Sequence, residues 1–153
     1  MSLEGLRKLS PILDELSVEP LRFLESVSSQ LEYAPREIIF EEDDPAGSFY
    51  VIEEGRVGLE VSIPAKESII IETLGRGDLL GISSMFPPAR WNWTARALEA
   101  TEMVAFDADA VRTRCLHDTE LAVHVYATVA AAAVRRLNAA RVRLLDLYPG
   151  HGS

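Results

Sequence analysis

The chain has few of the residues from which metal centres and disulfide frameworks are built. It contains one cysteine, Cys115, and three histidines among 153 residues. A single thiol excludes an intrachain disulfide framework and any cysteine-rich zinc or iron–sulfur centre. We therefore expect no metal in the protein and a reducing, cytoplasmic location.

Long apolar runs and a basic surface are also lacking. The most apolar stretch, residues 122–134, contains His124 and is shorter than the ~20 residues that a bilayer span needs. The net charge is −9, and most of the acidic residues precede residue 108. Because nucleic-acid affinity rests on neutralising phosphates, we expect neither a nucleic-acid partner nor a membrane partner.

The side chains that could support catalysis do not form a recognisable set. His117, His124 and His151 all lie beyond the region expected to form strands, and no two have ligand spacing within one strand. We expect Cys115 to be a buried helix residue rather than a reactive thiol. The acidic run at residues 41–44 is typical of a solvated loop. The sequence therefore predicts no catalytic residues and a protein that is not an enzyme.

The apolar content of 48% suits one globular domain spanning residues 1–153, with three zones of periodicity. Residues 1–30 show leucines at helical spacing. Residues 36–107 hold short β-rich runs between turn signals, which predicts an all-β barrel or sandwich. In residues 108–148 we expect a short helix capped by Asp107, then a long helix capped by Asp118 or Thr119 and ended by Pro149-Gly150. The clearest strand runs are residues 38–40, 49–52, 56–62, 68–74 and 93–100.

The long helix carries a regular apolar seam. Its members are spaced by alternating steps of three and four residues, the a and d spacing of a coiled coil, which predicts a homodimer through this helix. The alternative is a helix packed along its own barrel with no partner. A second apolar stripe of Leu121, Val125 and Val129 could face the barrel instead of the seam, which favours the dimer. The seam residues are Val123, Tyr126, Ala130, Ala133, Leu137, Ala140, Leu144 and Leu147.

The segment from Asp44 to Val57 resembles the signature turn and strand of cyclic nucleotide-binding domains in the catabolite-activator superfamily. An acid and a small residue precede four bulky apolar residues at 49–52, and Gly55 follows in register. Asp43 stands where the family usually has glycine, and aspartate tolerates left-handed turns.

This resemblance covers nearly the whole chain, from about Leu9 to Leu147. It implies a mainly β fold with flanking helices: a double-stranded β-helix, or jelly roll, of about eight strands, followed by a long C-terminal helix.

A second segment resembles the phosphate-binding cassette of that family but has lost its charged residues. In members that bind cyclic nucleotides, a Gly-Glu pair opens a short helix, and an arginine about ten residues later pairs with the phosphate. Here Gly81 is followed by Ile82, and the arginine position falls on Trp91. Arg90 could substitute only if the loop shifted by one residue, which would turn it to the opposite face. Losing two charge-assisted hydrogen bonds would weaken binding by about 10²–10⁴-fold, so we do not expect cyclic AMP or cyclic GMP in the usual mode.

The replaced cassette is unusually apolar and aromatic, and two interpretations stay open. Its side chains either fill the pocket as core, or form a pocket for a more apolar or planar effector that stacks on tryptophan. The candidate ligand-binding residues are Gly81, Ile82, Ser83, Ser84, Arg90, Trp91, Asn92 and Trp93.

The resemblance implies a regulatory sensor that acts through protein–protein contact. Only five residues follow Tyr148, which leaves no room for a DNA-recognition helix, so we expect a stand-alone dimer with an unknown protein partner. No cofactor is expected beyond an unidentified small-molecule effector. The alternatives are a genuine cyclic-nucleotide receptor with an altered cassette and a scaffold domain with a filled pocket.

Overall fold

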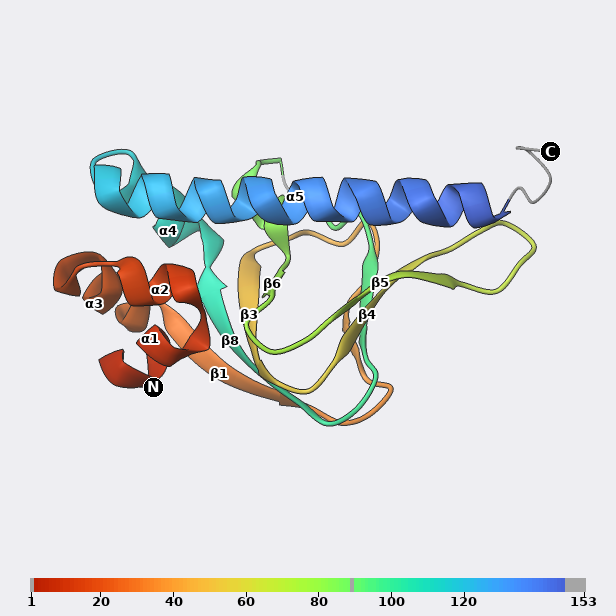
Figure 1. Cartoon of the computed structure of the whole chain (residues 1–153), viewed down its shortest axis with the longest axis horizontal. Helices are drawn as coiled ribbons and strands as arrows, with labels where there is room; N and C mark the ends of the chain where they lie inside the picture. The colour runs from red at the N-terminus through yellow and green to blue at the C-terminus, as the bar shows by residue number, and fades with distance from the viewer. Residues whose placement is uncertain (1, 89, 148–153) are drawn as a thin grey trace.

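The computed structural model describes residues 2–88 and 90–147, and its elements follow the expected order of helices, strands and helices (Figure 1). Three short helices open the chain: α1 (Leu3–Leu9), α2 (Pro11–Glu15) and α3 (Val18–Ser26). Serine side chains cap the first two, because Ser2 accepts a bond from the Gly5 N–H and Ser10 from the Leu13 N–H.

Eight strands in the described residues form two antiparallel sheets of four. The first sheet has the order β1-β8-β3-β6 and the second the order β2-β7-β4-β5. This confirms the mainly β jelly roll with flanking helices. The strands are β1 (Ser28–Tyr33), β2 (Ile38–Phe40), β3 (Ser48–Glu54), β4 (Val57–Val61), β5 (Ile69–Leu74), β6 (Leu79–Leu80), β7 (Thr94–Ala97) and β8 (Thr101–Asp107).

The first strand was not expected from the sequence. The helical zone predicted to reach residue 30 ends at Ser26, and the β-roll begins at Ser28 rather than at residue 36. β1 pairs with β8 along its whole length, from Ser28 opposite Phe106 to Tyr33 opposite Thr101. Its sequence is mostly polar, so it is stabilised by pairing with a strand over 60 residues away rather than by a local apolar pattern. The run predicted at residues 93–100 likewise ends early, as β7, and β8 follows it.

The four consecutive apolar residues of β3 are explained by burial on both faces of the strand. Phe49 and Val51 pack with the helices, whereas Tyr50 and Ile52 face the interior of the roll. The Phe49 ring stacks on Phe106 of β8 with ring centroids 5.2 Å apart. The first sheet therefore separates two hydrophobic cores, one under the helices and one inside the roll.

Two turns around β3 require left-handed backbone. Gly55 has φ 108°, and a Cβ atom there would lie 2.4 Å from Thr101 Oγ1, so only glycine fits this turn. Asp43 has φ 71°, which is the left-handed conformation that the resemblance implied for this position.

Two helices close the chain: α4 (Ala108–Cys115) and the 29-residue α5 (Thr119–Leu147). Asp107 caps α4 through the Ala110 N–H at 3.1 Å, and Asp118 caps α5 through the Leu121 N–H at 3.1 Å. The predicted helix end at Pro149-Gly150 lies outside the described residues. None of the helices in the described part of the chain has the length and apolar character needed to cross a membrane.

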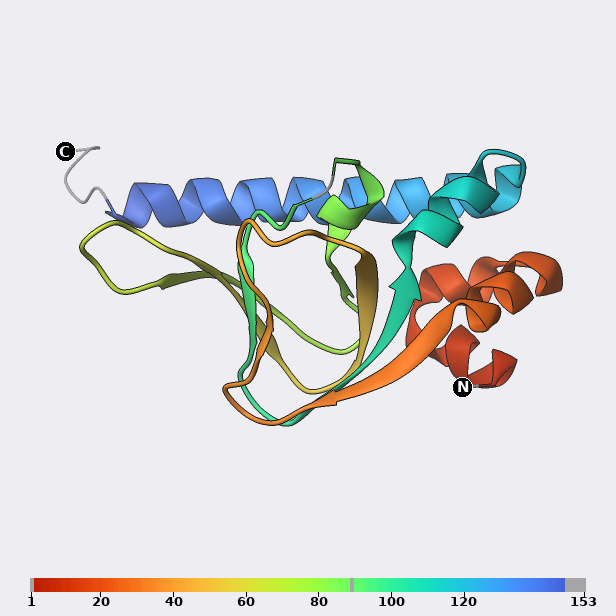
Figure 2. The ribbon, with the colours of Figure 1, turned by 180° about the vertical axis from the view of Figure 1, so that it is seen from behind.

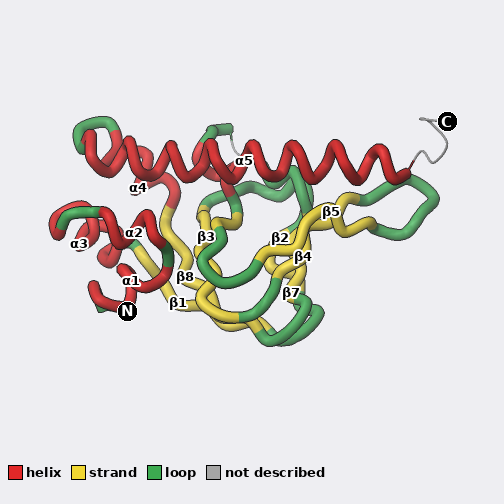
Figure 3. The backbone as a smooth tube through the Cα atoms, in the orientation of Figure 1, coloured by secondary structure: helices red, strands yellow, loops and turns green. Residues whose placement is uncertain are grey.

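The long helix α5 lies along one side of the roll and over the N-terminal helices, with its last turns beside the β4–β5 hairpin (Figures 1 and 3). Leu121, Val129 and Ala132 are buried on its inner face. The second apolar stripe therefore does face the protein's own core, as the sequence predicted. The reverse view shows the turn after β6 against the middle of α5 (Figure 2).

Candidate functional site

The cassette begins at a left-handed glycine followed by a single short turn. Gly81 has φ 86° and precedes the 3-10 helix η1 (Ile82–Met85). The hydroxyl of Ser84, which is fully buried, donates to the Gly81 carbonyl at 2.8 Å. The Arg112 guanidinium from α4 donates to the Ser84 carbonyl, so this turn is tied directly to the C-terminal helices.

Trp91 fills the interior of the roll in front of this turn. Its side chain is only 5% exposed and stacks on Phe40, with ring centroids 3.8 Å apart and an interplanar angle of 13°. The backbone N–H of Trp91 donates to the Asp44 carbonyl at 3.0 Å, and this bond holds the residue at the loop before β3. A Cβ atom added to Gly81 would lie 3.1 Å from the indole ring, so the ring packs against the glycine itself.

Tyr50 completes this aromatic cluster. Its ring centroid lies 6.2 Å from that of Phe40 and 6.4 Å from that of Trp91. Burial raises the pKa of the Tyr50 phenol to about 12, and the nearby Tyr33 adds to this shift. The phenol therefore stays neutral, and the cluster of Phe40, Tyr50 and Trp91 presents no charge to the space beside the cassette.

The other candidate residues lie around this cluster rather than within it. Arg90 is exposed, and its guanidinium donates to the Asp43 carbonyl at 2.6 Å in the acidic loop. The Asn92 amide donates to the Ser83 hydroxyl at 3.2 Å, while Ile82 is half-buried against the helical core. The structure thus places Gly81 against Trp91. It also places Ser83 against Asn92, and it keeps the Arg90 side chain at the acidic loop.

Trp93 borders a separate apolar cleft of about 270 Å³ between the β4–β5 hairpin and α5. Seven of its eight lining residues are apolar, and Arg143 is the exception. Two of them, Ala140 and Leu144, also belong to the seam predicted on α5. The lining residues are Val61, Ile63, Ile69, Ile71, Trp93, Ala140, Arg143 and Leu144.

A buried ion pair beside the roll was missed by sequence reasoning. Arg136 of α5 is 4% exposed, its Nε lies 3.4 Å from the Glu72 Oε2 of β5, and its guanidinium also donates to the Leu79 carbonyl. Burial lowers the pKa of Arg136, and the Glu72 carboxylate opposes that shift. The signal was present in the sequence, because the stripe of Leu121, Val125 and Val129 continues at helical spacing to Arg136. A charged residue in a buried stripe predicts a buried partner.

The predicted seam faces away from the core. Val123 is 60% exposed and Leu137 is 70% exposed, and the alanines at 130 and 133 are exposed between them. Ala140 is half-buried, and the side chain of Leu147 lies outside the described residues.

The remaining titratable candidates are scattered. Burial raises the pKa of the half-buried Cys115 thiol, and the Asp118 carboxylate adds to the shift, which disfavours a reactive thiolate. His117 is exposed in a loop and His124 is half-buried on α5, while His151 lies outside the described residues. Within residues 2–88 and 90–147, no group of three or more His, Cys, Asp or Glu side chains could hold a metal ion.

Solved structures share this arrangement over nearly the whole chain. A candidate cyclic nucleotide-binding protein from Geobacter metallireducens is 25% identical, with a TM-score of 0.77 over 90% of this chain and 98% of that chain. The N-terminal domain of a transcriptional regulator from Streptomyces coelicolor is 26% identical, with a TM-score of 0.66 over 97% and 99% of the two chains. The catabolite activator protein of Thermus thermophilus is 26% identical, with a TM-score of 0.68 over 91% of this chain and 63% of that one. No curated protein matches the chain.

The sequence of the β-roll also matches a family profile. The profile of the cyclic nucleotide-binding domain matches residues 30–118, which is more than half of the chain and includes the β3 signature, the cassette and α4. This match agrees with the two-sheet roll, the short cassette turn and the long final helix. The chain therefore belongs to the cyclic nucleotide-binding domain family of the catabolite-activator superfamily, a family of regulatory and signal-transduction domains.

Proposed function

We propose that this domain is a regulatory sensor that does not hold cyclic AMP or cyclic GMP in the usual mode of its family. It binds a small planar, apolar effector and acts by contact with a partner protein rather than by catalysis. The observation that carries the proposal is the position of Trp91. By the resemblance, this residue stands where nucleotide-binding members keep the phosphate arginine, and its indole packs against Gly81.

A cyclic phosphate in that position would meet an unfavourable environment. It would replace or displace the stacked rings of Phe40 and Trp91, and it would lose water without gaining a cation from the cassette. Burying an anion without a paired charge is costly, and Ile82 cannot accept a bond from a ribose hydroxyl. These two losses are the basis for expecting cyclic nucleotides to bind weakly.

The cleft beside Trp93 supports a small, planar and apolar effector. It is lined almost wholly by aliphatic side chains, with the indole on one side and the Arg143 guanidinium on α5. Its volume of about 270 Å³ lies just below the usual range of ligand pockets, which favours one small ring system. A flat apolar molecule could stack on Trp93, and Arg143 could lie over its face.

Two contacts support a route from the cassette to α5. Arg112 of α4 holds the Ser84 carbonyl of η1, and the Phe86 ring at the end of η1 lies 6.5 Å from the Tyr126 ring on α5. Tyr126 is a seam residue, and Ala140 and Leu144 belong to both the seam and the cleft. We propose that the domain forms a homodimer through this seam, and that the effector changes the dimer geometry by binding one state more tightly than the other.

Thermal unfolding with and without millimolar cyclic AMP and cyclic GMP tests the first part of the proposal. A ligand at ~100 times its dissociation constant adds about 2.7 kcal/mol of stability, which would raise the midpoint by about 5–10 °C in a chain of this size. We expect no increase with either nucleotide. A clear increase would instead support the genuine cyclic-nucleotide receptor.

The planar fluorescent dye 7-methoxycoumarin, which has one small fused ring system, serves as the probe for the effector cleft. We expect the wild-type domain to bind the dye, and Trp93→Ala to weaken binding roughly three- to tenfold through loss of stacking. Leu116→Ala, which changes an exposed leucine between α4 and α5, is the matched control. If neither the dye nor either nucleotide binds, the filled-pocket scaffold is the better interpretation, because the aromatic cluster around Trp91 then serves only as core.

A further inference from the structure

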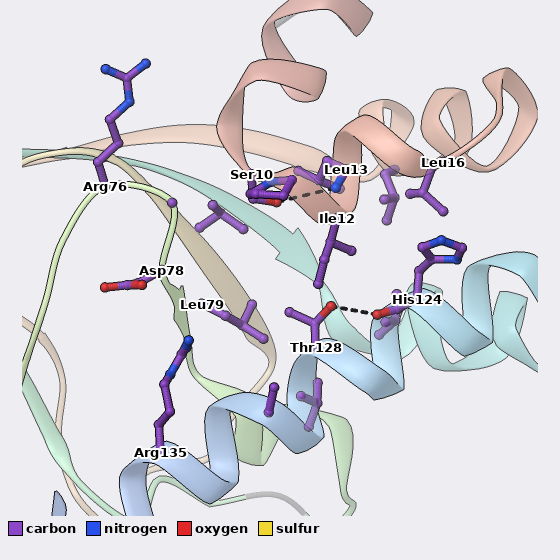
Figure 4. Close-up of a pocket in the computed structure, with 17 residues that line it drawn as sticks. Ser10, Ile12, Leu13, Leu16, Arg76, Asp78, Leu79, His124, Thr128 and Arg135 are labelled. Atoms are coloured by element: carbon purple, nitrogen blue, oxygen red, sulfur yellow. Dashed lines mark hydrogen bonds between the residues drawn. The ribbon is translucent and has the colours of Figure 1, made fainter.

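A larger cavity lies outside the β-roll, between α2, α5 and the turn that joins β5 to β6 (Figure 4). Its volume is about 430 Å³, within the range of small-molecule sites. It shares no lining residue with the cassette or with the cleft beside Trp93. The proposed effector cleft therefore does not account for it.

The floor of this cavity is apolar. Leu13 and Leu16 of the N-terminal helices, Val51 of β3, Leu79 of β6 and Val129 of α5 line it, and all five are buried. Ile12 stands at the opening as a half-buried aliphatic side chain. An apolar ligand body would remove more of this surface from water and would be stabilised by that burial.

One end of the cavity carries cationic side chains. Arg135 rises from α5 toward Asp78 and Leu79, whereas Arg76 starts at the β5–β6 turn and extends away from Arg135 (Figure 4). Both arginines are exposed, and neither takes part in the ion pairs formed by the described residues. Asp78 accepts a bond from the Gly75 N–H at 2.8 Å. The two arginines outnumber this one acid, in a chain whose net charge is −9.

The cavity opens on the side of α5 opposite the predicted seam. Thr128 and Arg135 line the cavity, and the seam residues Tyr126 and Ala133 precede them by two positions each. At 100° per residue, two positions turn the helix by about 200°. A dimer formed through the seam would therefore leave the cavity accessible.

We propose that this cavity binds a monoanionic amphiphile: a carboxylate with an unbranched apolar tail. The carboxylate pairs with Arg135, and the exposed Arg76 turns toward it, because the guanidinium fork suits carboxylate oxygens. The tail lies over Leu13, Val51 and Val129. Such a ligand connects α2 to α5 and holds the N-terminal helices against the helix that carries the seam.

Isothermal titration calorimetry with decanoate tests this proposal. We expect one decanoate to bind per chain, and decanol, which has the same tail without the charge, to bind roughly tenfold or more weakly. Arg135→Gln and Arg76→Gln should each weaken decanoate binding roughly three- to tenfold. Arg22→Gln, which removes an exposed arginine on α3 outside the cavity, is the matched control.

A variant that blocks the cavity tests whether decanoate binds there rather than in the effector cleft. Ala131 is exposed and lines the opening, so Ala131→Trp should abolish decanoate binding while the circular dichroism spectrum stays unchanged. Trp93→Ala should leave decanoate binding unchanged. Absence of binding to the wild type, equal binding of decanol, or full binding to Ala131→Trp would each overturn the proposal. None of these outcomes bears on the nucleotide and dye tests, so the two proposals fail separately.

Discussion

At the scale of single residues, Arg136 and Glu72 connect α5 to β5 through a buried ion pair. Desolvation is the dominant influence on Arg136, as the lowered pKa of its guanidinium indicates, but arginine remains charged at physiological pH. A buried pair gains little over a well-packed apolar pair. Removal of one partner, however, leaves an uncompensated buried charge.

We therefore expect Glu72→Gln to lower the free energy of unfolding by about 3–5 kcal/mol in urea denaturation, because Arg136 loses its counter-charge. The double variant Glu72→Met with Arg136→Met should cost far less. Asp109→Asn is the control, since it breaks the pair of Arg112 with an 85% exposed carboxylate and should cost at most about 1 kcal/mol. If Glu72→Gln left the free energy of unfolding unchanged, Arg136 would not be a buried charge that depends on Glu72.

At the scale of elements, α5 has two apolar faces with different surroundings. The inner face packs Leu121, Val129 and Ala132 on the protein's own core. The outer face exposes Val123 and Leu137 to solvent. The inner stripe therefore packs on the domain's own core, and the exposed outer seam is the surface through which the proposed dimer would form.

The proposed dimer predicts that Leu137→Glu lowers the dimer fraction in sedimentation analysis at micromolar concentration. Loss of about 1.5–3 kcal/mol of burial in each of two copies should weaken the dimer by about 10²-fold or more. Val142→Glu is the matched control, because Val142 is 54% exposed on the same helix and lies at the outward f position of the heptad. A monomeric wild type would contradict the seam interpretation.

At the scale of the whole molecule, a contact between residues 103 positions apart joins the N-terminal helices to α5. The Ser17 N–H donates to Glu120 Oε2 at 2.7 Å, and the Ser17 hydroxyl donates to the other carboxylate oxygen. These two bonds lower the pKa of Glu120, and the bond from the Ser17 hydroxyl contributes the most. The contact is stronger while the carboxylate is ionised, because hydrogen bonds to a charged acceptor are stronger.

A carboxylate whose pKa is lower in the folded state stabilises the fold above its unfolded pKa of about 4.3, and this contribution is lost as the pH falls through the folded value. We therefore expect wild type to be more stable than Glu120→Gln at neutral pH, and the difference to disappear in acid. Urea midpoints measured across that range test this. Glu67→Gln, an exposed change in the β4–β5 hairpin, should show no comparable convergence.

Features that depend on near neighbours in the chain were readable from the sequence. The apolar run of β3, the caps at Asp107 and Asp118, and the inner stripe of α5 are local patterns, and the structure confirms each of them. They were sufficient to predict the three zones of helices, strands and helices, because each element buries a face that its own spacing defines, whereas the jelly roll was implied by the family resemblance.

Features that depend on distant partners were decided only by the tertiary structure. The polar strand β1 exists because β8 pairs with it, and Arg136 is buried because Glu72 and the Leu79 carbonyl meet it. The sequence left open whether Trp91 fills the roll or lines a pocket. The stacking of Trp91 on Phe40, from a segment about fifty residues away, fills the space beside Gly81. Periodicity describes which face of an element is apolar, but which side chains meet across the core depends on how the sheets and helices pack.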